Sequence, residues 1–102
     1  MIALLEDNRE ALEELCRRYR VQRLEVFGSA ATGQQFAAHS DVDLLVEFAP
    51  AEPGRHADQY FGFLRELQAL LGRNIDLLVL AAIRNPYFLR NIDPQRELLY
   101  AA

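Results

Sequence analysis

The sequence contains no lysine, so all eleven of its basic residues are arginines. Without lysine, the chain has neither a P-loop lysine for nucleotide phosphates nor a lysine that forms a Schiff base. Its one cysteine, Cys16, excludes an internal disulfide and a multi-cysteine zinc site. Its two histidines, His39 and His56, are too few for a histidine-rich metal centre. We therefore exclude enzymes that depend on any of these groups.

Long apolar runs and an excess of positive charge are also missing. The net charge of −4 disfavours stable binding to nucleic acid. The longest apolar run covers residues 77–83, far short of the roughly 20 residues that a membrane-spanning helix needs. Glu6 and Asp7 follow the first apolar residues without a basic segment or a cleavage site, so no export signal is recognised. We expect one cytoplasmic domain over residues 1–102 that binds no membrane.

Hydrophobic periodicity predicts helices and strands in alternation along the chain. Apolar residues at helical spacing predict helices at 2–19, 29–35, 57–71 and 86–101, the last of which is interrupted by Pro94. Segments rich in β-branched and aliphatic residues predict strands at 21–27, 41–48 and 74–80. The order αβαβαβα predicts a small α/β domain.

Serine and threonine are scarce, and all three such residues lie between the first two predicted strands: Ser29, Thr32 and Ser40. Gly28 and Ser29 follow the first strand directly. Glycine allows a tight turn and close approach of a phosphate, and serine at a helix start offers a hydroxyl and backbone N–H groups to an anion. An ordinary strand-to-helix turn is the alternative interpretation.

Asp41 and Asp43 stand two residues apart at the second predicted strand. Residues with this spacing point to the same face, with attachment points about 6.7 Å apart. Two carboxylates in this arrangement are typical ligands for a hard divalent cation. The alternative is a capping or turn aspartate beside a solvent-facing acid.

Asp76 is an acid between aliphatic residues in the third predicted strand, which is unusual for a strand of this type. If that strand lies beside the second one, Asp76 joins Asp41 and Asp43. Otherwise it is an acid at a strand edge or in a salt bridge.

The combination of a strand, Gly28-Ser29, a short helix, Asp41-x-Asp43 and a later strand with Asp76 resembles the polymerase-β-like nucleotidyltransferase superfamily. The chain length and the segment Asn85-Pro86-Tyr87 make it similar to the minimal nucleotidyltransferase (MNT) group. The resemblance covers roughly residues 4–100. It implies a short mixed sheet of about three strands flanked by helices.

The resemblance also implies roles for the residues above. Gly28 and Ser29 would hold the nucleoside triphosphate, with Thr32 and Ser40 beside them. The metal and catalytic residues, which would bind Mg²⁺, are Asp41, Asp43 and Asp76. Asp76 would also receive the proton of the acceptor hydroxyl.

The implied function is Mg²⁺-dependent transfer of AMP from ATP to a tyrosine hydroxyl of a HEPN-type toxin, with this chain as the antitoxin. The chain departs from the family pattern because Ala30-Ala31-Thr32-Gly33 supply no arginine after Gly28-Ser29. This departure favours the alternative, an antitoxin with weak or lost catalysis that neutralises its toxin, which the resemblance implies to be a HEPN ribonuclease, by contact. Transfer to RNA or to a small molecule is a third possibility, which the acidic charge disfavours.

Three further features have open interpretations. Phe61 and Tyr87 are expected either at a partner interface or in the core, as are Phe88 and Tyr100. His39 either contacts a nucleotide or is an ordinary loop residue. Cys16 is expected on the buried side of its helix.

Overall fold

The computed structural model describes residues 1–34, 36–37 and 40–102. Within these residues the chain forms a four-stranded mixed sheet with the strand order β3-β2-β1-β4. The strands are β1 (Val21–Phe27), β2 (Val42–Phe48), β3 (Ile75–Val79) and β4 (Glu97–Ala101). Strand β1 is antiparallel to β2 and β4, whereas β2 and β3 are parallel. The mixed α/β sheet is confirmed, with four strands rather than the three expected.

The helices differ from the prediction mainly at their ends. They are α1 (Ala3–Asp7), α2 (Arg9–Arg18), α3 (Ser29–Thr32), α4 (His56–Leu71) and α5 (Pro86–Ile92), and the 3₁₀ turns are η1 (Leu80–Ala82) and η2 (Asp93–Gln95). The single helix predicted at 2–19 is broken at Asn8, whose side chain donates to the Leu4 carbonyl at 2.8 Å. Helix α3 ends at Thr32 because Gly33 adopts a left-handed conformation with φ 76°.

The predicted helix at 86–101 is wrong in its second half. Helix α5 ends at Ile92, and Pro94 lies in the turn η2 that follows it. Residues 97–101 form β4, which pairs with β1 and places Tyr100 opposite Leu24. Leucine-rich segments of this kind favour helix locally, but pairing with the free edge of β1 overrides that propensity.

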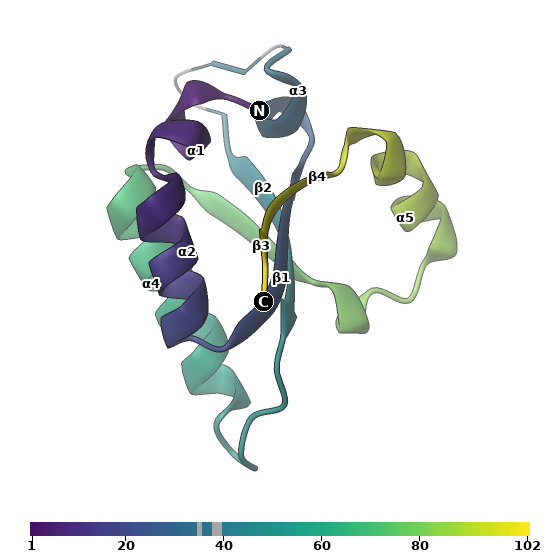
Figure 1. Ribbon diagram of the computed structural model, residues 1–102. Helices are drawn as coiled ribbons and strands as arrows, with labels where there is room; N and C mark the ends of the chain where they lie inside the picture. Colours follow the sequence, from purple (N-terminus) through teal and green to yellow (C-terminus); the bar gives the residue numbers. More distant parts are fainter. Residues whose placement is uncertain (35, 38–39) are drawn as a thin grey trace.

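The two faces of the sheet are covered unequally (Figure 1). Helices α1, α2 and α4 pack on one face, where Val42, Leu44 and Val46 of β2 join the main core. The other face carries α5 and a smaller cluster centred on Phe27, Leu45 and Ile92. Because β2 alternates between the faces, Asp43 lies on the α5 face beside Leu45. In the described part of the chain, no helix is both long and apolar enough to cross a bilayer.

Candidate active site at one end of the sheet

Asp43 on β2 and Asp76 on β3 are direct register partners in the parallel pair. Paired residues in a sheet project to the same face, so both carboxylates lie on the α5 face. Burial raises the pKa of the Asp43 carboxyl, and the negative charges of Asp76 and Asp41 raise it further. Strand β3 lies beside β2, which is the condition under which Asp76 joins Asp43, and the carboxylates are close enough to repel one another.

Asp41 lies just before β2, which begins at Val42 rather than at residue 41. Its side chain is exposed, as is that of Asp76, whereas Asp43 is half-buried. All three acids therefore gather at the end of the sheet where β2 and β3 begin. Asp43 is the member of the group that the protein desolvates most.

Gly28 borders the same carboxylate from β1. Phe27 pairs with Asp43, and the next residue, Gly28, turns the chain with φ 69°. A Cβ atom at position 28 would lie 2.6 Å from Oδ2 of Asp43, closer than real contacts allow. The glycine is therefore required both by its backbone, whose positive φ is combined with ψ −152°, and by the approach of the carboxylate.

The hydroxyl residues near this turn have different surroundings. Ser29 begins α3, and within the described residues its hydroxyl has no protein hydrogen-bond partner. The hydroxyl of Thr32 donates to the Gly28 carbonyl at 3.5 Å and accepts from the Gln34 amide at 3.2 Å. Ser29 is thus the better placed of the two to meet a ligand.

Ser40 is engaged in its own loop. Its Oγ accepts a hydrogen bond from the Ala37 amide at 2.9 Å, and its amide donates to the Ala37 carbonyl at 3.0 Å. Among the described residues, the Ser40 hydroxyl proton has no acceptor. His39, the other candidate in this loop, lies outside the described residues.

The donor set suits a hard divalent cation, because carboxylate oxygens are the ligands that such ions prefer. A cation would also relieve the repulsion that raises the pKa of Asp43. Among the residues that the structure describes, no three acids, histidines or cysteines are already close enough to hold an ion. Asp41, Asp43 and Asp76 would therefore have to converge on the metal when it binds.

One residue near the site was missed by sequence reasoning. The side chain of Arg73 contacts the loop before Asp41, with hydrogen bonds to the carbonyl oxygens of Ala37 and Ser40. No local pattern marks this arginine, since its partners are backbone groups more than thirty residues away. Its only sequence signal is its place between Gly72, which ends α4, and the strand that carries Asp76.

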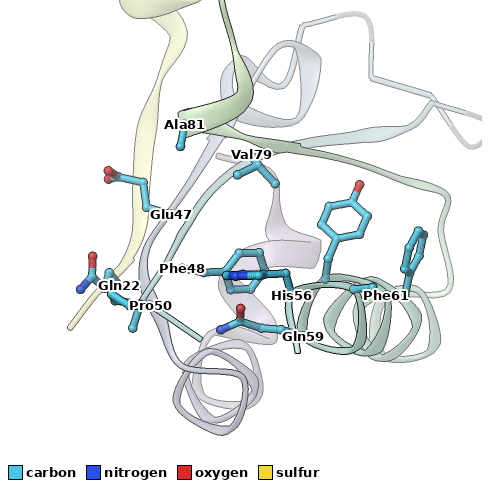
Figure 2. Close-up of a pocket in the computed structure, with 12 residues that line it drawn as sticks. Gln22, Glu47, Phe48, Pro50, His56, Gln59, Phe61, Val79 and Ala81 are labelled. Carbon is cyan, nitrogen blue, oxygen red and sulfur yellow. The ribbon is translucent and has the colours of Figure 1, made fainter. Parts of the chain in front are cut away.

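A separate pocket of about 510 Å³ lies at the opposite end of β2, around Phe48. Figure 2 shows Gln22 and Glu47 from the sheet on one side and Phe61 from α4 on the other. None of the predicted site residues lines this pocket. The carboxylate group and the pocket are therefore distinct features of the surface.

Comparison with known proteins agrees with this fold. The nucleotidyltransferase domain model matches residues 8–98. The chain is 33% identical over 97 residues to MJ0128 of Methanocaldococcus jannaschii, whose name proposes a protein adenylyltransferase, and the match covers 95% of this chain and 90% of that protein. A solved structure named as a proposed minimal nucleotidyltransferase superposes with a TM-score of 0.74 at 32% identity, covering 91% of this chain and 90% of the other.

A more distant structure shares the fold. It is a complex of the tri-AMPylated Shewanella oneidensis HEPN toxin with an MNT antitoxin, matched with a TM-score of 0.64 at 18% identity over 96% of this chain and 73% of the other. The family model spans most of the chain, and the strand register brings Asp43 and Asp76 together, which is one of the two arrangements that the sequence left open. The chain therefore belongs to the nucleotidyltransferase domain family and has the fold of the minimal nucleotidyltransferases.

Proposed function

We propose that the chain is a Mg²⁺-dependent adenylyltransferase that transfers AMP from ATP to a tyrosine hydroxyl of a HEPN-type toxin, as the antitoxin of that pair. The observation that carries this proposal is the pairing of Asp43 with Asp76 beside the Gly28 turn. The name of the relative MJ0128 supports protein as the acceptor, and the complex with an AMPylated HEPN toxin supports the partner class.

The binding roles follow the geometry of the site. Gly28 and Ser29 bind the triphosphate where the chain turns closely past Asp43. Thr32, which bonds to the Gly28 carbonyl, and Ser40, in the loop before β2, would contribute further hydroxyl groups to the nucleotide. The residues that would hold Mg²⁺ are Asp41, Asp43 and Asp76. When bound, the ion supplies charge neutralisation at the phosphates and at the attacking oxygen.

The reaction is a direct displacement at the α-phosphorus of ATP. The acceptor oxygen forms a new bond to this phosphorus, the bond to the bridging oxygen breaks, and pyrophosphate leaves with the bonding electrons. The hydroxyl proton passes to Asp76, whose carboxylate is exposed to an incoming acceptor. A covalent enzyme intermediate is not needed, since the sequence has no lysine and its one cysteine is buried in the core.

We further propose that residues 1–102 act as a single domain in the cytoplasm, where ATP is available, and that the partner supplies the acceptor surface. Mass spectrometry of the intact partner tests the reaction. We expect one or more AMP-sized additions after incubation with Mg-ATP and none with Asp43→Asn. An unmodified partner with wild-type protein would contradict transfer to protein.

A specific observation favours a second candidate, a contact-only antitoxin. Ala30 and Ala31, the residues after Gly28-Ser29, are buried and uncharged, so α3 offers the triphosphate no cationic side chain. In that case the partner's ribonuclease activity is inhibited without ATP, and Asp43→Asn inhibits as well as wild type. Measuring inhibition with and without Mg-ATP separates the two candidates.

A further inference from the structure

The side chain of Arg73 connects the end of α4 to the loop before β2. Its Nη2 atom donates hydrogen bonds to the carbonyl oxygens of Ala37 at 2.6 Å and Ser40 at 2.8 Å. The guanidinium lies over the ring of Phe36, with its central carbon 4.6 Å from the ring centroid. A planar, stacked guanidinium that bridges two carbonyls is held in one orientation. Arg73 is therefore an ordered link rather than a free surface charge.

This link acts directly beside Asp41. The Ser40 carbonyl belongs to the peptide group that leads into Asp41, and it is the group that Arg73 holds. On the other side of Asp41, the Val42 amide donates to the Asn74 carbonyl at 3.0 Å. Consecutive residues, Arg73 and Asn74, thus restrain both peptide groups that flank Asp41.

Asp41 needs such a restraint more than its neighbours do. Asp43 and Asp76 are fixed by the ladder between β2 and β3, but Asp41 precedes that ladder. Asp41 also carries the same charge as both of them, so repulsion favours movement of its exposed side chain away from the group. Without the Arg73 side chain, the Ser40 carbonyl would lose its hydrogen bond to the segment between α4 and β3.

We propose that Arg73 is a positioning residue, which holds Asp41 at the carboxylate group and thereby sets the affinity of the site for the divalent cation that accompanies the nucleotide. The inference rests on the proposed function, since it assumes that Asp41 is a metal ligand. Residues that orient metal ligands change metal affinity by roughly 10–100-fold when they are replaced. We expect the loss of metal affinity to lie at the lower end of this range, because the hydrogen bond from the Val42 amide to the Asn74 carbonyl still restrains the other side of Asp41.

A Mg²⁺ titration tests the proposal without any acceptor. The stability of the protein is measured by thermal unfolding at a fixed concentration of α,β-methylene ATP, which cannot be cleaved at the reacting bond. Variants are Arg73→Met, which keeps an apolar stem over Phe36 but removes the donors, Asp41→Asn, and the two combined. Arg18→Met is the matched control, because Arg18 pairs with Glu66 at 3.1 Å on the exposed surface of α2.

The midpoint is the Mg²⁺ concentration that gives half of the full stabilisation. Arg73→Met is expected to raise this midpoint about tenfold, and Arg18→Met to leave it unchanged. In the Asp41→Asn background, Arg73→Met is expected to add little, because the two residues act through the same ligand. If Arg73→Met does not fold, Arg73→Lys keeps the charge and the stem, and a midpoint above that of wild type is expected from it as well.

Three results would overturn the proposal. An unchanged midpoint in a folded Arg73 variant would mean that Arg73 stabilises the loop without affecting metal affinity. An equal rise with and without Asp41→Asn would mean that Arg73 acts elsewhere. If Mg²⁺ and the analogue fail to stabilise even the wild-type protein, the proposed function fails and this inference falls with it, whereas failure of the Arg73 variants alone leaves the proposed function intact.

Discussion

Asp43 on β2 and Asp76 on β3 are register partners, and their carboxylates lie side by side on one face of the sheet. They lie at the end of the sheet where the chain leaves β1 at Gly28. A protein that pairs two carboxylates in this way incurs electrostatic repulsion in the absence of a cation. The proposed function would account for this repulsion, since a cation bound with the nucleotide would neutralise the two carboxylates.

Asp43→Asn should stabilise the protein when no metal is present. The raised pKa of Asp43 means that its charged form is disfavoured in the folded state, so the carboxylate is destabilising at pH values above that pKa. The stability gain from Asp43→Asn is therefore largest near neutral pH and shrinks as the pH falls through the raised pKa. Thermal unfolding in the presence of a chelator, at several pH values, measures it.

Glu52→Gln is the control for this experiment, because Glu52 is an exposed acid in the loop before α4. Its replacement should leave stability nearly unchanged at every pH. A metal-free Asp43→Asn protein that is less stable than wild type near neutral pH would show that the carboxylate is stabilised by its surroundings and would argue against a site built for cations.

Gly28→Ala should be strongly destabilising. A residue other than glycine at this positive φ and ψ −152° costs about 1–3 kcal/mol, and crowding against Oδ2 of Asp43 adds about 1–3 kcal/mol. Gly54→Ala is the matched control, since Gly54 has φ 84° but no other group within 4 Å of the position that a Cβ atom would take. Urea unfolding should show a larger loss at position 28 than at position 54, and Asp43→Ala should reduce the excess. Equal losses at the two glycines would mean that the close approach has no energetic effect.

The sequence was sufficient to identify the aspartates of the candidate site, but not the strand β4 or the contacts of Arg73. Aspartates two residues apart and a later acid among aliphatic residues are local signals, and they single out Asp43 and Asp76, which the structure pairs. The pairing itself depended on the order of the strands, which these signals left open. The role of residues 97–101 depends on the free edge of β1, which no local pattern reveals. Arg73 contacts backbone carbonyls far along the chain, and such contacts place no requirement on the type of residue at the other end.

Glu25 should contribute to stability through its arginine partners. It is a buried acid on β1, 5% exposed, and it accepts hydrogen bonds from Arg96 at 2.7 and 3.1 Å and from Arg23 at 3.2 Å. Burial alone would raise its pKa, but the two arginines hold the pKa below the ordinary value. Arg96→Met leaves this carboxylate without its main partner and should cost about 3 kcal/mol.

The stability that Glu25 contributes is present above the pKa of the unfolded chain, and it is lost as the pH falls through the lower pKa of the folded state. The difference in urea stability between wild type and Arg96→Met should therefore be largest near neutral pH and should narrow in acid. A difference that does not depend on pH would attribute the loss to packing of the Arg96 side chain instead.

Phe61 and Tyr87 should contribute to partner binding rather than to folding. Their side chains are 61% and 68% exposed, whereas Phe88 and Tyr100, the other two aromatics in question, pack against the two cores. Exposed aromatic side chains often dominate binding energy at interfaces. Phe61→Ala and Tyr87→Ala should change unfolding stability by less than about 0.5 kcal/mol, while affinity for the HEPN-type partner falls in a titration. Unfolded variants, or unchanged affinity with both, would place the interface elsewhere.

The central claim is that the carboxylate group catalyses nucleotidyl transfer, and the position of the phosphate that reaches the acceptor tests it most directly. The complex with the HEPN-type partner is incubated with Mg²⁺ and ATP that is radiolabelled either at the α-phosphate or at the γ-phosphate. We predict that the partner retains label from the α-phosphate only, and that Asp76→Asn lowers the rate of labelling more than it weakens nucleotide binding. Label from the γ-phosphate, or α-labelling at the wild-type rate in the Asp76→Asn protein, would contradict the account.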